Sequence, residues 1–426
     1  MRLSHPPAPS YYALNDAWAA REPLRGEVRA DVAVLGGGIA GCSAALHLAQ
    51  RGYRVVLLEA RAVGYGASGR SGGQTIFGLA VGQPKLAREV GRENALRLFD
   101  LSIEALDLTQ SLIRDHAIDC DYHSNHAHVA VKPRHVQELE EWSRELRDEY
   151  GYASARFLND DELQDQVRSP RYLAGLLDTR SGHLQPLKYT QGLARAAEAA
   201  GARIHENSEV LRYEDGAEVR VHTAHGTVRC AHLVLCGNAY IGAVAPSLAR
   251  RILGVGTYII ATQPLGEERA RSLLPQHAAV ADINWILDYF RRSRDHRLLF
   301  GGRVSYSSVQ PPRLAESMRQ RMVRVFPSLA DIKVAYAWGG YLDITMTRAP
   351  NFGRLAPNVY YLQGFSGHGL ALAGLAGKLA SEAIAGTAER FDVFARIPHR
   401  DFPGGPVLRR PSLVLAMLYY RLRDLL

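Results

Sequence analysis

The chain is poor in cysteine and has no long apolar run. Its 426 residues include four cysteines, Cys42, Cys120, Cys230 and Cys236, without the paired spacing of a metal site. A zinc framework and a disulfide-stapled fold are therefore excluded as organising elements, and a reducing, cytoplasmic compartment is expected.

Export and membrane signals are missing as well. Pro6, Pro7 and Pro9 stand where a signal peptide needs its apolar core. The most membrane-like stretch, residues 413–420, is far shorter than the roughly 20 residues that span a bilayer. We expect it to form a helix docked on protein rather than on a membrane.

Charge of one sign is not concentrated in any segment. The formal net charge is +8, but the densest basic cluster, residues 291–294, is followed directly by Asp295. This spread argues against a nucleic-acid partner and favours solubility with a bias towards anionic small molecules. The length and the 47% apolar content predict two or three domain-sized units, enough for a cofactor domain and a substrate domain.

The first strong motif is a glycine turn between a strand and a helix. Residues 31–35 form a buried-strand pattern, residues 42–51 a helical pattern, and residues 53–59 a second strand. Glycines between them allow a tight turn and close approach to a pyrophosphate, while an acid after the second strand can bind ribose hydroxyls. The residues predicted to contact a dinucleotide here are Gly36, Gly38, Ile39, Ala40, Gly41, Glu59, Ala60 and Arg61. Acid at position 59 argues against NADP, but FAD and NAD share the motif.

Two further glycine-rich segments favour FAD. Residues 64–74 can pass close to a flavin without side-chain obstruction, although a flexible surface linker is the alternative interpretation. Residues 364–370 lie between a strand, residues 359–363, and a helix, residues 370–385, so a helix N-terminus would face the electron-rich flavin ring. The predicted contacts are Gly66, Ala67, Ser68, Gly69, Arg70, Ser71, Gly72, Gly73 and Gln74, then Gly364, Ser366, Gly367, His368, Gly369 and Leu370. A long cofactor that touches both ends of the chain explains the separation of these segments.

Taken in order, these motifs resemble the D-amino-acid oxidase superfamily of FAD-dependent oxidoreductases, and within it the gamma-glutamylputrescine oxidoreductases. The resemblance covers about residues 12–387, including 256–262 and 287–292. It implies an α/β (α+β overall) fold, with a Rossmann-like FAD-binding domain and an antiparallel-sheet substrate domain whose segments interleave. It also implies that Val210 contacts adenine through its backbone and that Gly237 and Gly340 lie near the cofactor.

The expected domain boundaries follow from this resemblance. An N-terminal arm would comprise residues 1–30, and a C-terminal tail with a helix residues 391–426. The FAD-binding domain would comprise residues 31–85, 155–245 and 336–390, and the substrate domain residues 86–154 and 246–335.

The implied reaction is hydride removal from the carbon next to an amine nitrogen, followed by hydrolysis of the imine to an aldehyde. The substrate is expected to be gamma-glutamylputrescine or a related polyamine derivative. An apolar pocket would favour the neutral amine, and its candidate residues are Tyr258, Trp285, Tyr289, Phe290 and Trp338. We predict His368, Tyr289 and Trp285 as catalytic residues. Arg292 or Arg303 would bind a substrate carboxylate, although surface charge is the alternative for either.

The electron acceptor stays open at this point. Sarcosine-oxidase relatives place a lysine over the flavin, whereas no lysine occurs here between Lys188 and Lys333. Dioxygen, helped by His368 or by the flavin environment, and a different acceptor are both compatible with the sequence, and so is a glycine-, sarcosine- or D-amino-acid-type oxidase. The oligomeric state is not predicted.

The remaining alternatives concern the histidines and the function class. His123, His126 and His128 have no acid or cysteine partner at metal-site spacing, so we predict no metal. No cysteine lies near residues 364–370, so we expect non-covalent FAD. A flavin-dependent tRNA-modifying or structural module, or a dehydrogenase that docks on a membrane through its tail, are the competing functions.

Overall fold

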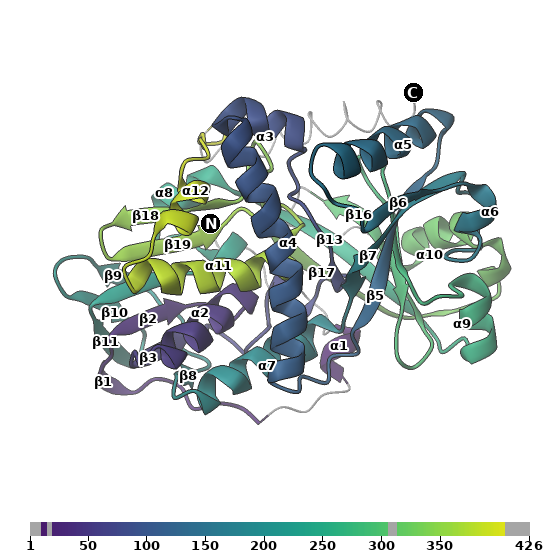
Figure 1. Ribbon diagram of the computed structural model, residues 1–426. Coiled ribbons are helices and arrows are strands. Elements are labelled where there is room, and N and C mark those ends of the chain that lie inside the picture. Colours follow the sequence, from purple (N-terminus) through teal and green to yellow (C-terminus); the bar gives the residue numbers. More distant parts are fainter. Residues whose placement is uncertain (1–9, 15–18, 306–312, 405–426) are drawn as a thin grey trace.

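The computed structural model describes residues 10–14, 19–305 and 313–404 (Figure 1). The helix expected at residues 413–420 lies outside this part of the chain. The described residues build three sheets, which confirm the predicted mixture of a parallel, Rossmann-like sheet and a largely antiparallel one.

The first sheet has six strands and forms the centre of one half of the molecule. Its order is β18-β19-β12-β2-β3-β8, and every neighbouring pair is parallel except β18 with β19. The strands are β2 (Val32–Leu35), β3 (Val55–Leu58), β8 (Arg203–His205), β12 (His232–Leu235), β18 (Asn351–Ala356) and β19 (Val359–Gln363). Segments from the whole length of the chain therefore meet in one sheet.

Helices cover one face of this sheet (Figure 1). They are α2 (Ile39–Gln50), α4 (Arg92–Asp115), α7 (Pro186–Ala199) and α11 (Gly369–Ile384), and α12 (Glu389–Ala395) packs against β18. The contact between α2 and α11 is close because α11 carries glycine where side chains would collide. A Cβ on Gly377 would lie 2.5 Å from the Ala40 carbonyl oxygen, and the Ser43 hydroxyl donates to the Gly374 carbonyl at 2.6 Å.

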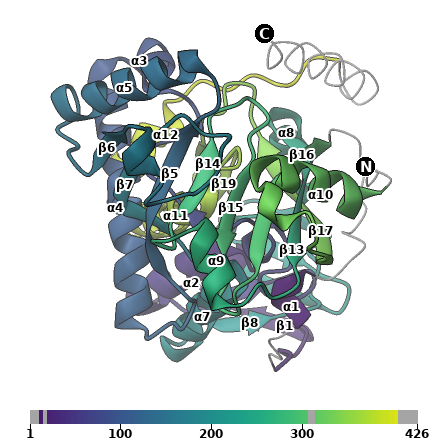
Figure 2. The same cartoon turned by 90° about the vertical axis from the view of Figure 1, so that its right-hand side faces the viewer.

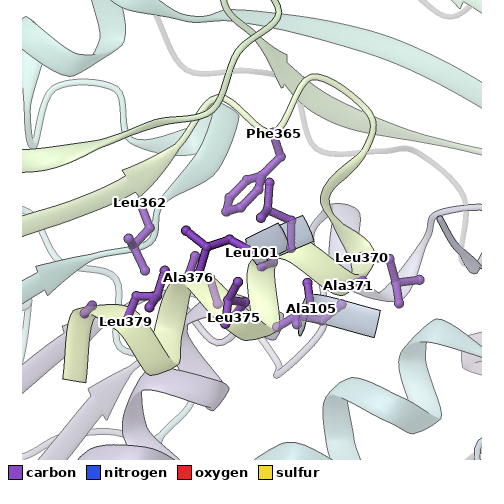
Figure 3. Close-up of a cluster of buried hydrophobic side chains, with 14 of the residues drawn as sticks. Leu101, Ala105, Leu362, Phe365, Leu370, Ala371, Leu375, Ala376 and Leu379 are labelled. Carbon is purple, nitrogen blue, oxygen red and sulfur yellow. The ribbon is translucent and has the colours of Figure 1, made fainter. Parts of the chain in front are cut away.

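A continuous apolar core joins α11 to α4 and β19. Figure 3 shows Leu101 and Ala105 of α4 against Leu375 of α11, with Phe365 above the helix. Fully burying one such large side chain contributes about 1.5–3 kcal/mol. This core fixes the start of α11 relative to the six-stranded sheet.

The second sheet covers the other face. Its order is β1-β11-β10-β9, with β1 (Gly26–Arg29), β9 (Arg212–Glu214), β10 (Val219–His222) and β11 (Gly226–Cys230). Successive side chains of the parallel strands point to opposite faces, so the six-stranded sheet packs against the helices on one side and the second sheet on the other. Val32 and Val34 belong to the core under the helices, whereas Ala33 joins the core shared with the second sheet.

The third sheet has nine strands and forms the other half of the molecule. Its path is β17-β13-β16-β15-β14-β5-β7-β4, with β6 paired to β7, and only β14 and β5 run parallel. The strands are β4 (Gln74–Thr75), β5 (His123–Ala130), β6 (Ala155–Leu158), β7 (Ala174–His183), β13 (Leu253–Thr262), β14 (Ala279–Asp282), β15 (Tyr289–Arg292), β16 (Leu298–Ser305) and β17 (Val334–Ile344).

The nine-stranded sheet has an outer and an inner face. In Figure 2, α9 (Glu267–Leu273) and α10 (Leu314–Val325) lie in front of it, and Phe290 packs in the same outer core as Met318 and Met322. Tyr289, which alternates with Phe290, points to the inner face and packs near Trp338. The inner face is the one turned towards the glycine-rich segments.

The remaining helices complete the surface. They are α1 (Tyr11–Leu14), α3 (Gln83–Val90), α5 (Pro133–Asp148), α6 (Asp160–Leu163) and α8 (Pro246–Arg251). None of the helices in the described ranges combines the length and apolar character needed to cross a membrane.

Two element boundaries follow from local backbone geometry. Gly91 separates α3 from α4 with a φ of 82°. β9 begins at Arg212, and the Leu211 N–H donates to the His222 carbonyl at 2.8 Å just before it.

Candidate active site

The first glycine turn leaves no room for side chains. Gly36 has a φ of 103°, and a Cβ there would lie 2.6 Å from the Cys236 carbonyl oxygen. A Cβ on Gly41 would lie 1.9 Å from the Gly36 carbonyl oxygen. The backbone therefore folds tightly onto the N-terminus of α2, where the helix dipole and the N–H groups of the first turn favour an anion such as a pyrophosphate.

Glu59 follows β3 and holds this turn. Its carboxylate accepts hydrogen bonds from the Gly37 N–H at 2.7 Å and the Arg61 N–H at 2.9 Å. Burial raises the pKa of Glu59, while these two donors act in the opposite direction. A carboxylate has about four acceptor positions, so Glu59 can still bind a ribose hydroxyl.

The segment that carries Val210 runs beside Glu59. The Ser208 N–H donates to the Glu59 carbonyl, and the Asn207 N–H to the Arg61 carbonyl, both at 2.8 Å. Val210 itself is buried. The two segments predicted to bind the adenosine end of a cofactor are therefore adjacent.

The second glycine segment is packed against the first turn. The Gly64 N–H donates to the Gly37 carbonyl at 2.9 Å, and the Ser68 hydroxyl accepts from the Ile39 N–H at 3.0 Å. A Cβ on Gly69 would lie 2.1 Å from the Gly64 carbonyl oxygen. These contacts hold the segment against the start of α2, so the alternative of a flexible surface linker is wrong.

Two buried arginines bind the same segment to the nine-stranded sheet. The Arg70 guanidinium donates to the carbonyls of Tyr65 at 3.0 Å and Gly339 at 3.1 Å, and burial lowers its pKa. The Arg291 guanidinium donates to the Gly72 carbonyl at 2.7 Å. In the described ranges no carboxylate pairs with Arg291. Arg291 was not predicted from the sequence as a site residue, although the neighbouring Arg292 was.

The third glycine segment has a strained, left-handed backbone. Gly364, Ser366 and Gly367 have φ values of 79°, 54° and 87°, and α11 starts directly afterwards at Gly369. The His368 ring contacts the Phe77 carbonyl at 2.8 Å through Nε2. Because a carbonyl oxygen only accepts, Nε2 carries the proton, and burial lowers the pKa of His368, so the ring is neutral.

A buried acid that the sequence analysis missed joins three segments here. The Asp343 carboxylate accepts from the N–H groups of Gly364 and, at 3.2 Å, of Phe365. The Asn238 side chain, next to Gly237, also bonds to it, and burial raises the pKa of Asp343 to about 7. An acid inside an otherwise apolar strand was the available signal.

The predicted pocket residues are not all brought together. Tyr289 stands on the inner face, and its ring fills the space that side chains on Gly72 and Gly301 would need. Tyr258 and Phe290 belong to the outer core. Trp338 is 1% exposed and donates to the Arg70 carbonyl at 3.0 Å, under Tyr12 of the N-terminal arm.

Trp285 and the two predicted carboxylate-binding arginines lie elsewhere. Trp285 is 39% exposed and stacks with Arg348, whose guanidinium carbon is 4.6 Å from the ring centre. Side chains alternate along β15, so Arg292 points to the outer face, opposite to Tyr289 and Arg291. Its Nε and Nη1 have no hydrogen-bond partner among the described residues. The Arg303 side chain lies outside the described part of the structure.

Cysteine and metal chemistry add nothing to this site. Cys42, Cys120 and Cys230 are buried free thiols, and Cys236 is partly buried. Burial raises the pKa of the Cys236 thiol to about 12. Within the residues that the structure describes, no group of acids, histidines and cysteines is arranged to hold a metal ion.

The three glycine segments fit an extended dinucleotide cofactor. The start of α2 and Glu59 suit a pyrophosphate and a ribose, and the start of α11 faces the same region from the other end of the chain. Gly340 lies against the second glycine segment, where a Cβ would be 3.3 Å from the Cβ of Arg70. The donor set therefore suits FAD, held by backbone N–H groups and a single acid.

Comparisons with known proteins agree with this arrangement. Gamma-glutamylputrescine oxidoreductase of Escherichia coli (strain K12) is 39% identical over 417 residues, which cover 97% of this chain and 98% of that protein. A probable oxidoreductase, OrdL, of Haemophilus influenzae is 39% identical over 407 residues, 94% of each chain.

Solved structures share the fold at lower identity. Glycine oxidase from Bacillus cereus has a TM-score of 0.71 at 21% identity, covering 87% of this chain and 99% of its own. L-amino acid deaminase from Proteus vulgaris has a TM-score of 0.72 at 17% identity, covering 88% and 99%. The DAO family of FAD dependent oxidoreductases matches residues 31–383, and the chain belongs to that family.

Proposed function

We propose that this FAD-dependent oxidoreductase oxidises gamma-glutamylputrescine, or a related gamma-glutamylated polyamine, in polyamine catabolism. The carrying observation is the nearly end-to-end match to the Escherichia coli gamma-glutamylputrescine oxidoreductase, 39% identical over 417 residues. A glycine-, sarcosine- or D-amino-acid-type oxidase is the second candidate, because a glycine oxidase of Bacillus licheniformis is 24% identical over 84% of this chain.

The environment of the inner face suits a neutral amine. When bound, FAD supplies the hydride acceptor, and the protein supplies alignment and electrostatics. Burial raises the pKa of Tyr289 and lowers that of His368, so both side chains are uncharged at neutral pH. An ammonium ion gains no countercharge from either, so the neutral amine, whose lone pair assists loss of hydride, is favoured. Trp285, by its exposure, would act only at the mouth of such a site.

Two arginines bind the second of the glycine segments that would hold the cofactor. The Arg70 and Arg291 side chains bind carbonyl oxygens of loop residues, and the start of α11 adds its helix dipole. These groups would stabilise negative charge that develops on reduction. Asp343, at the base of the third segment, would position that helix start.

The glutamyl carboxylate needs a cationic partner, and three arginines are candidates. Arg292 and Arg303 follow from the sequence, and Arg291 is added because it lies on the inner face. Substituting each by alanine separates them: loss of the true anchor raises KM for gamma-glutamylputrescine but leaves KM for putrescine unchanged. Arg292 loses its candidacy if R292A leaves both constants unchanged.

The electron acceptor is proposed to be dioxygen. Another acceptor is the alternative, because no lysine lies between Lys188 and Lys333. Peroxide formed under air, compared with dye reduced without air, distinguishes an oxidase from a dehydrogenase. A cytoplasmic location is part of the proposal and is supported by the free thiols.

Anaerobic flavin bleaching tests the function. Purified holoprotein is mixed with gamma-glutamylputrescine, putrescine, sarcosine, glycine and D-alanine, and the loss of the visible flavin band is followed. The proposal expects bleaching by gamma-glutamylputrescine at the lowest concentration. Bleaching by D-alanine alone would overturn the substrate, and a flavin inert to every amine would overturn the reaction. Acid precipitation should release the flavin if attachment is non-covalent.

A further inference from the structure

Two of the three histidines of β5 point into the protein and form a pair, whereas His123 is exposed. His126 and His128 alternate to the same face of the strand, and their ring centres are 4.6 Å apart. His126 is fully buried, and the His128 ring packs against Trp142, with 5.0 Å between ring centres. Among the described residues they belong to no group of three or more acids, histidines and cysteines that could hold a metal ion.

The hydrogen bonds of His126 fix which of its nitrogens carries the proton. The Gln74 side-chain amide donates through Nε2 to the Val280 carbonyl at 3.1 Å, which leaves Gln74 Oε1 as an acceptor. His126 Nε2 lies 3.3 Å from that oxygen and must therefore donate to it. A neutral ring then has its lone pair on Nδ1.

That lone pair has no hydrogen-bond partner among the described residues, and two further buried polar atoms of β4 and β5 have none either. His126 Nδ1, His128 Nε2 and Thr75 Oγ1 are all buried without a hydrogen-bond partner among the described residues. Burial lowers the pKa of His126 well below its usual value and that of His128 to about 3. Both rings are neutral at pH 7, so His126 offers a further partner only its acceptor, Nδ1. Leaving such groups unpaired in the interior is costly.

The pair lies between two segments predicted to hold the cofactor. Gln74, which bonds to His126, ends the second glycine segment. His368, in the third segment, donates to the Phe77 carbonyl at 2.8 Å, and the Phe77 ring lies against His128 with 6.4 Å between ring centres. A ligand bound against these histidines would therefore meet the region where the second and third segments converge.

We propose that His126 forms the amine-binding subsite, in which Nδ1 accepts a hydrogen bond from the N–H of the substrate amine and His128 borders the same position. This inference rests on the proposed function. An acceptor that engages the N–H leaves the nitrogen lone pair free to assist loss of hydride. It also selects primary and secondary amines, because a neutral tertiary amine has no N–H to donate.

Two substitutions of His126 separate its two nitrogens. Glutamine places a donor near the Nε2 position and loses the Nδ1 acceptor, whereas asparagine keeps an oxygen near Nδ1 and loses the contact with Gln74. Dissociation constants come from perturbation of the flavin absorbance of oxidised holoprotein, and from saturation of anaerobic reduction by gamma-glutamylputrescine. We expect H126Q to weaken binding about tenfold, the loss of one hydrogen bond, and H126N to stay near the wild type.

A tertiary amine and a control variant complete the design. Wild type should bind gamma-glutamylputrescine more tightly than its N,N-dimethyl derivative, and H126Q should lose this preference. His232 begins β12, away from the glycine segments, and its Nδ1 is also unpartnered, so H232Q should leave both constants unchanged. If both His126 variants misfold, the 15N shift of His126 Nδ1 in labelled wild type should move when amine binds.

The outcomes distinguish this subsite from the reaction itself. If wild-type flavin is not reduced by any amine, the proposed function fails, and the subsite with it. If wild type is reduced but H126Q binds amine equally well, an ordered water satisfies Nδ1 and the subsite alone is overturned. Equal loss of FAD in H126Q and H126N, or an unmoved Nδ1 shift, would show a packing role and overturn it too.

Discussion

Replacing Asp343 by asparagine should remove a pH-dependent component of stability. Burial raises the pKa of Asp343 from 3.8 to about 7. Between these values the folded protein holds the proton and the unfolded chain releases it, so this residue's contribution to stability falls as pH rises. Below the folded pKa this contribution to the free energy of unfolding grows by about 1.4 kcal/mol per pH unit. Between pH 8 and pH 5 it therefore grows by about 3 kcal/mol, nearly all of it below pH 7.

The assay is urea unfolding of holoprotein with FAD in fixed excess, at several pH values between 5 and 8. The free energy of unfolding of wild type minus that of D343N should rise by about 3 kcal/mol as pH is lowered across this range. Taking the difference cancels histidines such as His47, whose pKa burial lowers to about 4, because both proteins contain them. A difference that does not vary with pH would refute the reasoning, since the carboxyl would then titrate at its ordinary pKa.

Three further substitutions test the packing of the cofactor region. G41A should abolish FAD binding in a flavin titration, because its Cβ would lie 1.9 Å from the Gly36 carbonyl oxygen, whereas G82A, with nothing within 4 Å, should bind FAD normally. E59Q should raise the Kd for FAD about tenfold or more, since a neutral amide binds ribose hydroxyls less strongly than a carboxylate; an unchanged Kd would contradict a ribose contact. G377A should lower the free energy of unfolding by about 1–3 kcal/mol, because α2 and α11 must separate, and a thermal melt unaffected by it would show that the helices yield freely.

The local motifs were predictable because their chemistry is local. A strand, a glycine turn and a helix require particular residues at fixed spacing, so the sequence predicted β2, α2 and β3 within a few residues. The same holds for β19 and α11 with the glycine segment between them. Each depends on neighbours along the chain, and periodicity and turn chemistry report on those directly.

The side chains around the substrate depend on contacts between distant segments, and the sequence predicted them less well. Trp285 and Trp338 looked alike as aromatic pocket residues, yet one stacks on Arg348 at the surface and the other lies under the N-terminal arm. The choice of Arg292 over Arg291 missed the strand alternation that turns Arg291 inward. Asp343 was missed because its partners come from loops more than 20 residues away.

The strand order of the six-stranded sheet also bears on biosynthesis. β12 separates β2 from β19, and β19 and β18 complete one edge although they are made last. A nascent chain that has left the ribosome only as far as β12 still lacks the helix start at Gly369. If the N-terminus of α11 contacts the cofactor as proposed, cofactor binding waits until the chain has been translated past Gly369, and such long-range pairing favours slow folding. Free flavin would stabilise the chain only after that point, when the fold that binds it is complete.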